Sequence, residues 1–189
     1  MKRNIILCIA LMALFTSCVK SPQIYRLLSK EEQEIVPYQV GQHIRMLNQD
    51  GDTIQLAVVR DEYELGYEGE FYRPSKLSIV PPPYSYVRRL ELTSHADDSL
   101  FMRLIVGPNK LLQGYWSNKQ TYGGVFLDLL NIPTETLEIN GITYENVYRA
   151  ESNEYGIHGD ESTHEIWLYN EAFGVLAIKK GMVSYNLVK

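Results

Sequence analysis

A polar stretch from Glu151 to Glu165 holds the side chains of this sequence most suited to chemistry. Among its carboxylates and imidazoles are His158, Asp160 and His164. If such groups fold close together they can bind a divalent cation, or a histidine and an aspartate can pass a proton. A charged run is more often a solvated loop between strands. The sequence therefore favours a solvated loop and predicts no cofactor, with His158, Asp160 and His164 as the candidate ligands of any metal site.

The motifs of well-known enzyme classes are incomplete in this chain. The segment that starts at His164 begins a zinc-protease pattern, but Leu168 stands where the second histidine must be. Ser117 and Ser184 lack the flanking glycines of a nucleophile elbow. We therefore expect a protein without catalytic residues. The alternative is a hydrolase or metal-dependent enzyme that uses residues 151–165.

Aromatic residues near a proline run and several glycines form a second candidate site. Exposed flat rings beside polar groups suit stacking on sugars or contact with a protein. The alternative, which the pattern favours, is that tyrosine is simply a good strand residue whose ring packs while its hydroxyl stays at the rim. The candidate ligand contacts are Tyr84, Tyr86, Tyr115, Trp116 and Tyr122.

The N-terminal residues have the pattern of an export signal. Lys2 and Arg3 precede an apolar run over residues 5–15, which is shorter than the roughly 20 residues of a membrane-spanning helix. The segment that ends in Ser17 and Cys18 resembles the lipobox of bacterial lipoproteins, in the looser form of the Bacteroidetes type. That resemblance implies a signal peptide over residues 1–17 and lipids joined to Cys18. The alternative is an ordinary secretory signal with a chance cysteine.

Cleavage before Cys18 would leave the mature chain without a free thiol. Cys8 lies in the signal, and Cys18 would carry the lipid. Disulfides, cysteine nucleophiles and zinc–thiolate sites are then excluded. The chain has 18 basic and 23 acidic residues and a formal net charge of −5. This balance argues against binding to nucleic acid, which requires clustered basic residues.

The remainder divides into a tether and a single domain. Residues 18–36 form the lipidated tether and a short helix, because Ser29 and Glu32 have the spacing of a capping box. We expect about two helical turns that end at Val36, since Pro37 disfavours a helical conformation in the residue before it. Residues 37–189 are long enough for one compact domain.

Alternating apolar residues predict strands throughout residues 37–189. Between His43 and Val59, a three-residue loop with Gly51 in the left-handed conformation would place Met46 opposite Ile54 and keep apolar side chains on one face. The turn Asn140-Gly141 would place Ile139 opposite Ile142, Leu137 opposite Tyr144 and Glu138 opposite Thr143. Further strands are expected over 86–93, 100–106, 111–116, 125–130, 165–169, 173–178 and 183–188.

This count of about ten strands with no long helix predicts an all-β domain with one antiparallel arrangement. Short links between neighbouring strands favour a curved meander or half-barrel, and a β-sandwich is the alternative. Residues 125–130 leave a further choice, because a run of that length also fits a helical turn.

Four motifs resemble small Bacteroidetes lipoproteins of unknown function. Residues 37–42 and 47–54 are similar to their opening segment, and residues 140–148 and 167–176 are similar to their closing segment. The resemblance implies a cell-envelope lipoprotein and supplies no catalytic residue.

We therefore expect a lipid-anchored envelope protein with a binding or assembly role, held to the membrane through Cys18, whose partner is an envelope protein or a glycan. A carrier of lipid or another apolar ligand inside a barrel-like cavity is a further alternative. Surface-exposed lipoproteins of the Bacteroidetes type often carry acidic residues directly after the cysteine, which residues 19–23 lack. This favours an outer-membrane position that faces the periplasm.

Overall fold

The computed structural model describes residues 27–67, 84–94, 100–119, 121–154 and 163–188. The predicted signal peptide and Cys18 lie outside these ranges, as do His158 and Asp160. Among the described residues, no helix has the length and apolar character needed to cross a membrane. The strands are β1 (His43–Asn48), β2 (Thr53–Tyr67), β3 (Tyr84–Ser94), β4 (Phe101–Gly107), β5 (Leu111–Ser117), β6 (Tyr122–Asp128), β7 (Thr134–Ile139), β8 (Ile142–Glu154), β9 (Thr163–Asn170), β10 (Gly174–Lys180) and β11 (Val183–Val188).

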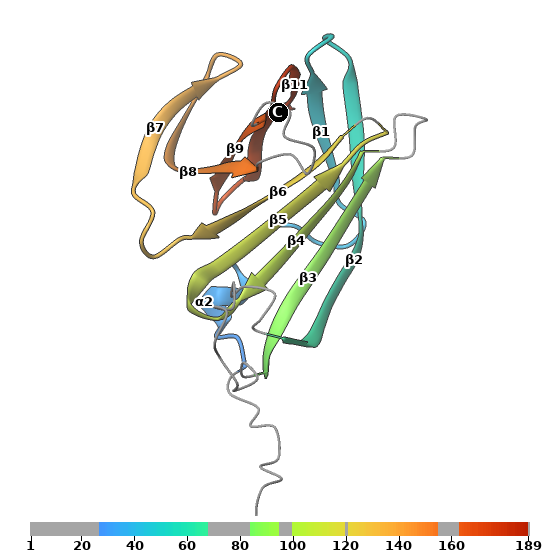
Figure 1. The fold of residues 1–189 in the computed structure, drawn as a ribbon. Helices are drawn as coiled ribbons and strands as arrows, with labels where there is room; N and C mark the ends of the chain where they lie inside the picture. Colours follow the sequence, from blue (N-terminus) through green and yellow to red (C-terminus); the bar gives the residue numbers. More distant parts are fainter. Residues whose placement is uncertain (1–26, 68–83, 95–99, 120, 155–162, 189) are drawn as a thin grey trace, which may run out of the picture.

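All of these strands belong to one antiparallel sheet in the order β6-β5-β4-β3-β2-β1-β11-β10-β9-β8-β7. Strands that follow each other along the chain pair, except β6 and β7, which are the two edges of the sheet. The pairing of β1 with β11 joins the two halves in the middle of the sheet. The sheet curls so that β6 comes against β8 and β9 (Figure 1). The predicted all-β half-barrel is therefore confirmed, as a single sheet instead of a sandwich.

The strand registers that we predicted for the two hairpins are confirmed. Met46 lies opposite Ile54 across a three-residue loop in which Gly51 has a φ of +87°. Ile139 lies opposite Ile142 across the Asn140-Gly141 turn, where both residues have positive φ. Residues 122–128 form strand β6, so the helical alternative for this segment is wrong.

The core lies on the concave side of the sheet. Its large side chains come from both halves and leave less than 2% of their surface exposed: they include Trp116, Tyr144, Trp167 and Tyr169. Aromatic side chains of this size bury roughly 150–250 Å² each and dominate the energy of a core. These rings occupy the interior that an apolar-ligand carrier would need to keep hollow.

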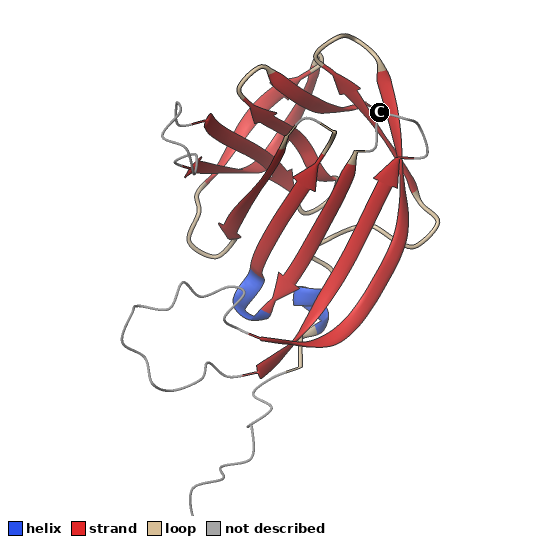
Figure 2. Ribbon diagram, turned by 45° about the vertical axis from the view of Figure 1, so that its right-hand side comes forward, coloured by secondary structure: helices blue, strands red, loops and turns tan. Residues whose placement is uncertain are grey.

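The N-terminal helix is shorter than expected. Helix α2 (Lys30–Gln33) has the predicted capping box, in which Ser29 Oγ accepts from the Glu32 amide at 3.2 Å and Glu32 Oε2 accepts from the Ser29 amide at 2.7 Å. It ends at Gln33 instead of Val36, because the residues that follow turn into the core and Val36 is buried there. Glu32 Oε1 also accepts from the Asn109 amide, in the turn between β4 and β5. Figure 2 shows α2 and the short 3-10 helix η2 (Pro108–Lys110) at the same end of the sheet.

Residues 28–38, which we call the N-terminal strap, are held on the concave side by long polar side chains. The Arg88 guanidinium donates to the backbone carbonyls of Gln33, Val36 and Tyr38, the last two at 3.0 and 2.9 Å. Arg88 also pairs with Asp61 at 2.8 Å. The strap is thus fixed to the sheet through its backbone, and most of its apolar side chains are also buried in the core.

Two buried tyrosines hold the same segment. Tyr169 donates its hydroxyl proton to the Ile35 carbonyl, and the Tyr38 hydroxyl accepts from the Val175 amide at 2.7 Å. Burial raises the pKa of both hydroxyls well above their usual value. Burial, followed by a hydrogen bond to Glu171, raises the pKa of Tyr148 to about 12.

These pKa values predict alkaline unfolding. A tyrosine of the unfolded chain loses its proton near pH 10, whereas these three keep theirs in the fold. Above that pH the folded state binds more protons than the unfolded state, so the free energy of unfolding falls as the pH rises from about 10 to 12. Urea unfolding at several pH values measures the decline, and Tyr38→Phe should make it shallower. Tyrosinate absorbance from these three groups before any loss of native circular dichroism would contradict the prediction.

Candidate functional site

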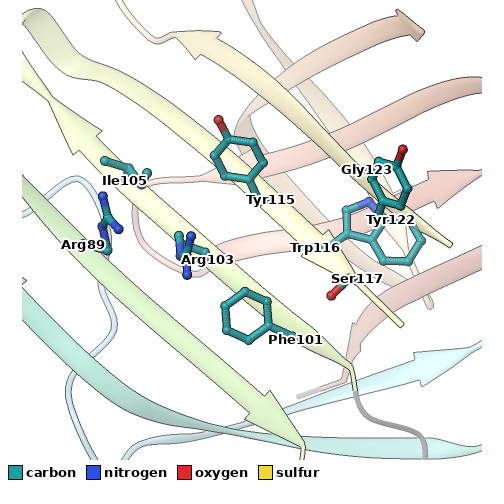
Figure 3. A pocket seen from close by; sticks show the side chains of 9 residues that line it. All are labelled: Arg89, Phe101, Arg103, Ile105, Tyr115, Trp116, Ser117, Tyr122 and Gly123. Atoms are coloured by element: carbon teal, nitrogen blue, oxygen red, sulfur yellow. The ribbon is translucent and has the colours of Figure 1, made fainter. Parts of the chain in front are cut away.

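An open groove of about 360 Å³ lies on the outer face of strands β3 to β6. Its volume falls at the low end of the roughly 300–1,000 Å³ that is common for ligand pockets. Figure 3 shows its lining, which consists of Arg89, Phe101, Arg103, Ile105, Tyr115, Trp116, Ser117, Tyr122 and Gly123.

Strand alternation decides which side chains face the groove. Arg103 lies beside Tyr115 on β5, and Tyr115 lies beside Gly124 on β6, so these three positions form one outward row. The next row along the strands places Trp116 beside Gly123 and points inward, because successive side chains in a strand face opposite sides of the sheet. The Trp116 ring therefore lies in the core.

Two tyrosine rings are exposed and held in place. Tyr115 is 39% exposed, and its ring lies over Gly124, where a Cβ atom would come within 2.9 Å of its Cδ1. Gln113 donates to the Tyr115 hydroxyl. Tyr122 is 66% exposed, and the Lys180 ammonium lies 5.6 Å from its ring centroid while donating to its backbone carbonyl at 2.7 Å. Both rings thus have defined orientations before any ligand arrives.

The arginines of the groove are paired with carboxylates. Arg103 lies 2.9 Å from Glu91, and its guanidinium carbon stands 5.4 Å from the Phe101 ring centroid. Arg89 lies 2.6 Å from Glu64. In Figure 3, Arg103 lies between Phe101 and Tyr115. The groove therefore offers fixed N–H donors between aromatic rings.

A buried polar cluster lies directly beneath the groove, and we call Trp116, Glu165, Trp167 and Lys180 the closure cluster. Glu165 is 1% exposed, and its Oε1 accepts from both indole N–H groups at 2.7 Å. Its Oε2 accepts from the Gly124 amide at 3.2 Å and lies 3.7 Å from the Lys180 ammonium. These contacts join β5 and β6 to β9 and β10, so they hold the β6 edge of the curled sheet against the other half.

The structure separates the aromatic residues that we grouped from the sequence. Tyr115 and Tyr122 meet at the groove. Trp116 is only 1% exposed, so its ring is no surface contact. Tyr86 lies on the same inward face of β3 as Arg88. The side chain of Tyr84 is not among those that the structure describes. Trp116 and Tyr86 therefore lie on a different face from Tyr115 and Tyr122, because neighbours in sequence alternate between the faces of a strand.

The candidate metal ligands are not assembled in the described part of the chain. His164 Nε2 lies 2.9 Å from Glu151 Oε2, and Arg149 lies 2.6 Å from the other oxygen of this carboxylate. The hydrogen bond from Arg149, followed by that from His164, lowers the pKa of Glu151. Among the described residues, no group of three or more potential ligands could hold a metal ion. His158 and Asp160 lie outside these residues.

Sequence reasoning missed the polar half of the site. Arg103 lies two residues from Phe101 and from Ile105, so period-two alternation could have placed it on the same outward face. Alternation could also have placed Glu165 on one face with Trp167, but the contacts of Glu165 with Trp116 and of Lys180 with Tyr122 join residues distant in sequence and gave no such signal. None of the protein-family models, curated proteins or solved structures compared with this chain matches it.

Proposed function

We propose that this protein is a non-catalytic, lipid-anchored binding protein of the cell envelope, and that the outer groove is its contact surface. The observation that carries the proposal is the pair of exposed, oriented rings of Tyr115 and Tyr122 beside two fixed arginines. Large exposed rings are unusual on an isolated surface when they are held in place, and they are enriched where proteins meet ligands.

The residues that line the groove favour a binding function over a hydrolytic one. The described residues that line the groove include no histidine or cysteine, and the carboxylates beside it, Glu64 and Glu91, are paired with Arg89 and Arg103. Arginine stays protonated at all ordinary pH values and cannot act as a general base. The groove is thus equipped to hold a ligand and lacks the group that would activate a nucleophile.

The place of the strap in the fold is compatible with a lipid anchor that leaves the groove accessible. Cys18 precedes Leu27 by nine residues, which span at most about 30 Å when fully extended. The strap begins at the end of the sheet where Glu32 contacts Asn109. Phe101 and Tyr122 lie at the other end of their strands, about 20 Å farther along β4. When the strap end of the sheet faces the membrane, this end of the groove therefore points away from it.

Co-sedimentation with delipidated envelope material tests the proposal. Wild type should partition into a detergent phase, and Cys18→Ser should remain in the aqueous phase. The Cys18→Ser chain should still co-sediment with the envelope material, whereas the same chain with Tyr122→Ala should lose most of its bound fraction. The aromatic ring is exposed, so this substitution should leave the unfolding midpoint nearly unchanged.

The two parts of the proposal fail separately. Aqueous partitioning of the wild-type chain, when it is produced in a host that lipidates lipoproteins, would refute the anchor. Envelope binding that is equal with and without the Tyr122 ring would refute the groove as the contact surface.

A further inference from the structure

We propose that the outer groove binds an uncharged oligosaccharide, with Tyr115 and Tyr122 as stacking surfaces for its sugar rings. This inference rests on the proposed role of the groove as a contact surface and names the class of its ligand. A sugar ring has an apolar C–H face and a rim of hydroxyls, and the groove offers the matching combination of flat rings and polar groups.

The two tyrosine rings are spaced to contact successive sugar units. Tyr122 stands two residues before Gly124 on β6, and Gly124 lies opposite Tyr115. Diagonal neighbours on one face of a sheet have their backbones roughly 7–8 Å apart, so each ring can serve its own unit of a chain. The close approach of Tyr115 to Gly124 leaves the ring lying against the strand, and Figure 3 shows its face open to the viewer. A tyrosine standing upright on the sheet would offer only an edge.

The charge balance of this face favours an uncharged ligand. Three guanidinium groups and three carboxylates lie here on neighbouring strands, so their formal charges cancel. The pairs are Arg60 with Glu62, Arg89 with Glu64 and Arg103 with Glu91. A polyanion would meet Glu64 and Glu91 as well as the arginines and would have to displace existing pairs. An uncharged ligand has no such cost.

The groove also supplies hydrogen-bond donors. A guanidinium has five N–H donors in a rigid fork, and a single carboxylate does not occupy all of them. Arg103 lies between the Phe101 and Tyr115 rings and lines the groove, while its Nε and Nη2 contact Glu91, so Nη1 can serve the hydroxyls of a stacked sugar. Ser117 adds a hydroxyl at the end of the groove nearest Tyr122. The donors are held by Glu64 and Glu91, which reduces the entropy lost on binding.

The closure cluster positions one of the two rings. Glu165 lies 3.7 Å from the Lys180 ammonium, and this ammonium stands over the Tyr122 ring. Lys180 is thus a positioning residue that acts on the ligand through Tyr122. Lys180→Met should weaken binding less than Tyr122→Ala does, because the ring remains present but loses its fixed orientation.

Calorimetric titration of the full chain in detergent tests the inference. The probes are soluble neutral oligosaccharides, namely linear glucans, xylans and mannans, with polygalacturonate as the acidic comparison. We expect at least one neutral series to bind, with an affinity that hardly changes between low and high salt. Tyr115→Ala and Tyr122→Ala should each lower this affinity by about tenfold or more. Phe126→Ala is the matched control, because Phe126 is 42% exposed on the outer face of the same strand and does not line the groove.

The outcomes separate this inference from the proposed function. Absence of binding to every neutral series, or binding to polygalacturonate alone, would overturn the inference. An equal loss of affinity in Phe126→Ala would overturn the assignment of the sugar to the groove. If envelope co-sedimentation still depends on Tyr122 while all neutral glycans fail, the groove remains a contact surface and its ligand belongs to another class.

Discussion

Replacing Glu165 with Gln is expected to lower the free energy of unfolding by about 3 kcal/mol. The carboxylate is almost fully buried and accepts four contacts, two of them from the indole N–H groups of Trp116 and Trp167. In the variant, one oxygen can still accept from the indoles. The amide nitrogen, however, would face the Gly124 amide and the Lys180 ammonium, which are both donors. Removing one partner of a buried pair leaves the other charge without compensation, and that accounts for the size of the effect.

Urea unfolding of Glu165→Gln, Lys180→Met and the double variant measures the coupling. We expect the double variant to be at least as stable as Glu165→Gln alone, because it removes the uncompensated ammonium. Glu138→Gln is the matched control, since Glu138 is exposed on β7, and its unfolding midpoint should match that of wild type. Additive losses in the double variant would contradict the assignment of Glu165 and Lys180 to one cluster.

Replacing Arg88 with Met is expected to have an effect of similar size, about 3 kcal/mol, and to release the N-terminal strap. The guanidinium supplies donors to three strap carbonyls and pairs with Asp61. Methionine fills much of the space but leaves these carbonyls and the Asp61 carboxylate without that partner. Each buried acceptor left in this way costs about 1–3 kcal/mol, less where water reaches it.

Trypsin cleavage after Lys30 distinguishes release of the strap from general unfolding. Lys30 is exposed in helix α2, so its cleavage rate reports how often the strap opens. Arg88→Met should speed this cleavage at urea concentrations where the circular dichroism is still native. Arg88→Lys should give an intermediate rate, because one ammonium cannot contact all of these partners. Arg60→Met is the control, since Arg60 pairs with Glu62 on the surface, and unchanged cleavage in Arg88→Met would contradict the prediction.

The strap and the closure cluster stabilise the same curled sheet through different strands. The strap joins β3 to β9 and β10 through Arg88, Tyr169 and Tyr38. The closure cluster joins β5 and β6 to β9 and β10. A half-barrel has two edge strands that need such contacts, because its sheet does not close by hydrogen bonding. The orientation of Tyr122, and with it the groove, therefore depends on how the barrel is held together.

The sequence by itself determined the local parts of this protein. The registers across Gly51 and across Asn140-Gly141 follow from turn residues and from alternation within a few positions. The capping box at Ser29 is equally local. Enough hairpins of this kind define an all-β chain, and short links between them define a meander. The half-barrel that we preferred over a sandwich was confirmed. It rested on short links, which let consecutive strands pair in order within each half of the sheet.

Only the tertiary structure decided where the ends of the sheet meet and which polar groups are buried there. Glu165 follows His164 in what looks like part of a metal motif, yet its carboxylate points at two tryptophans from different strands. Tyr115 and Trp116 are adjacent in sequence, and one lines the groove while the other fills the core. Alternation shows that two neighbours face opposite sides, but only contacts between residues far apart in the chain show which side is buried. Those contacts depend on the curl of the whole sheet, which no short segment of the sequence encodes.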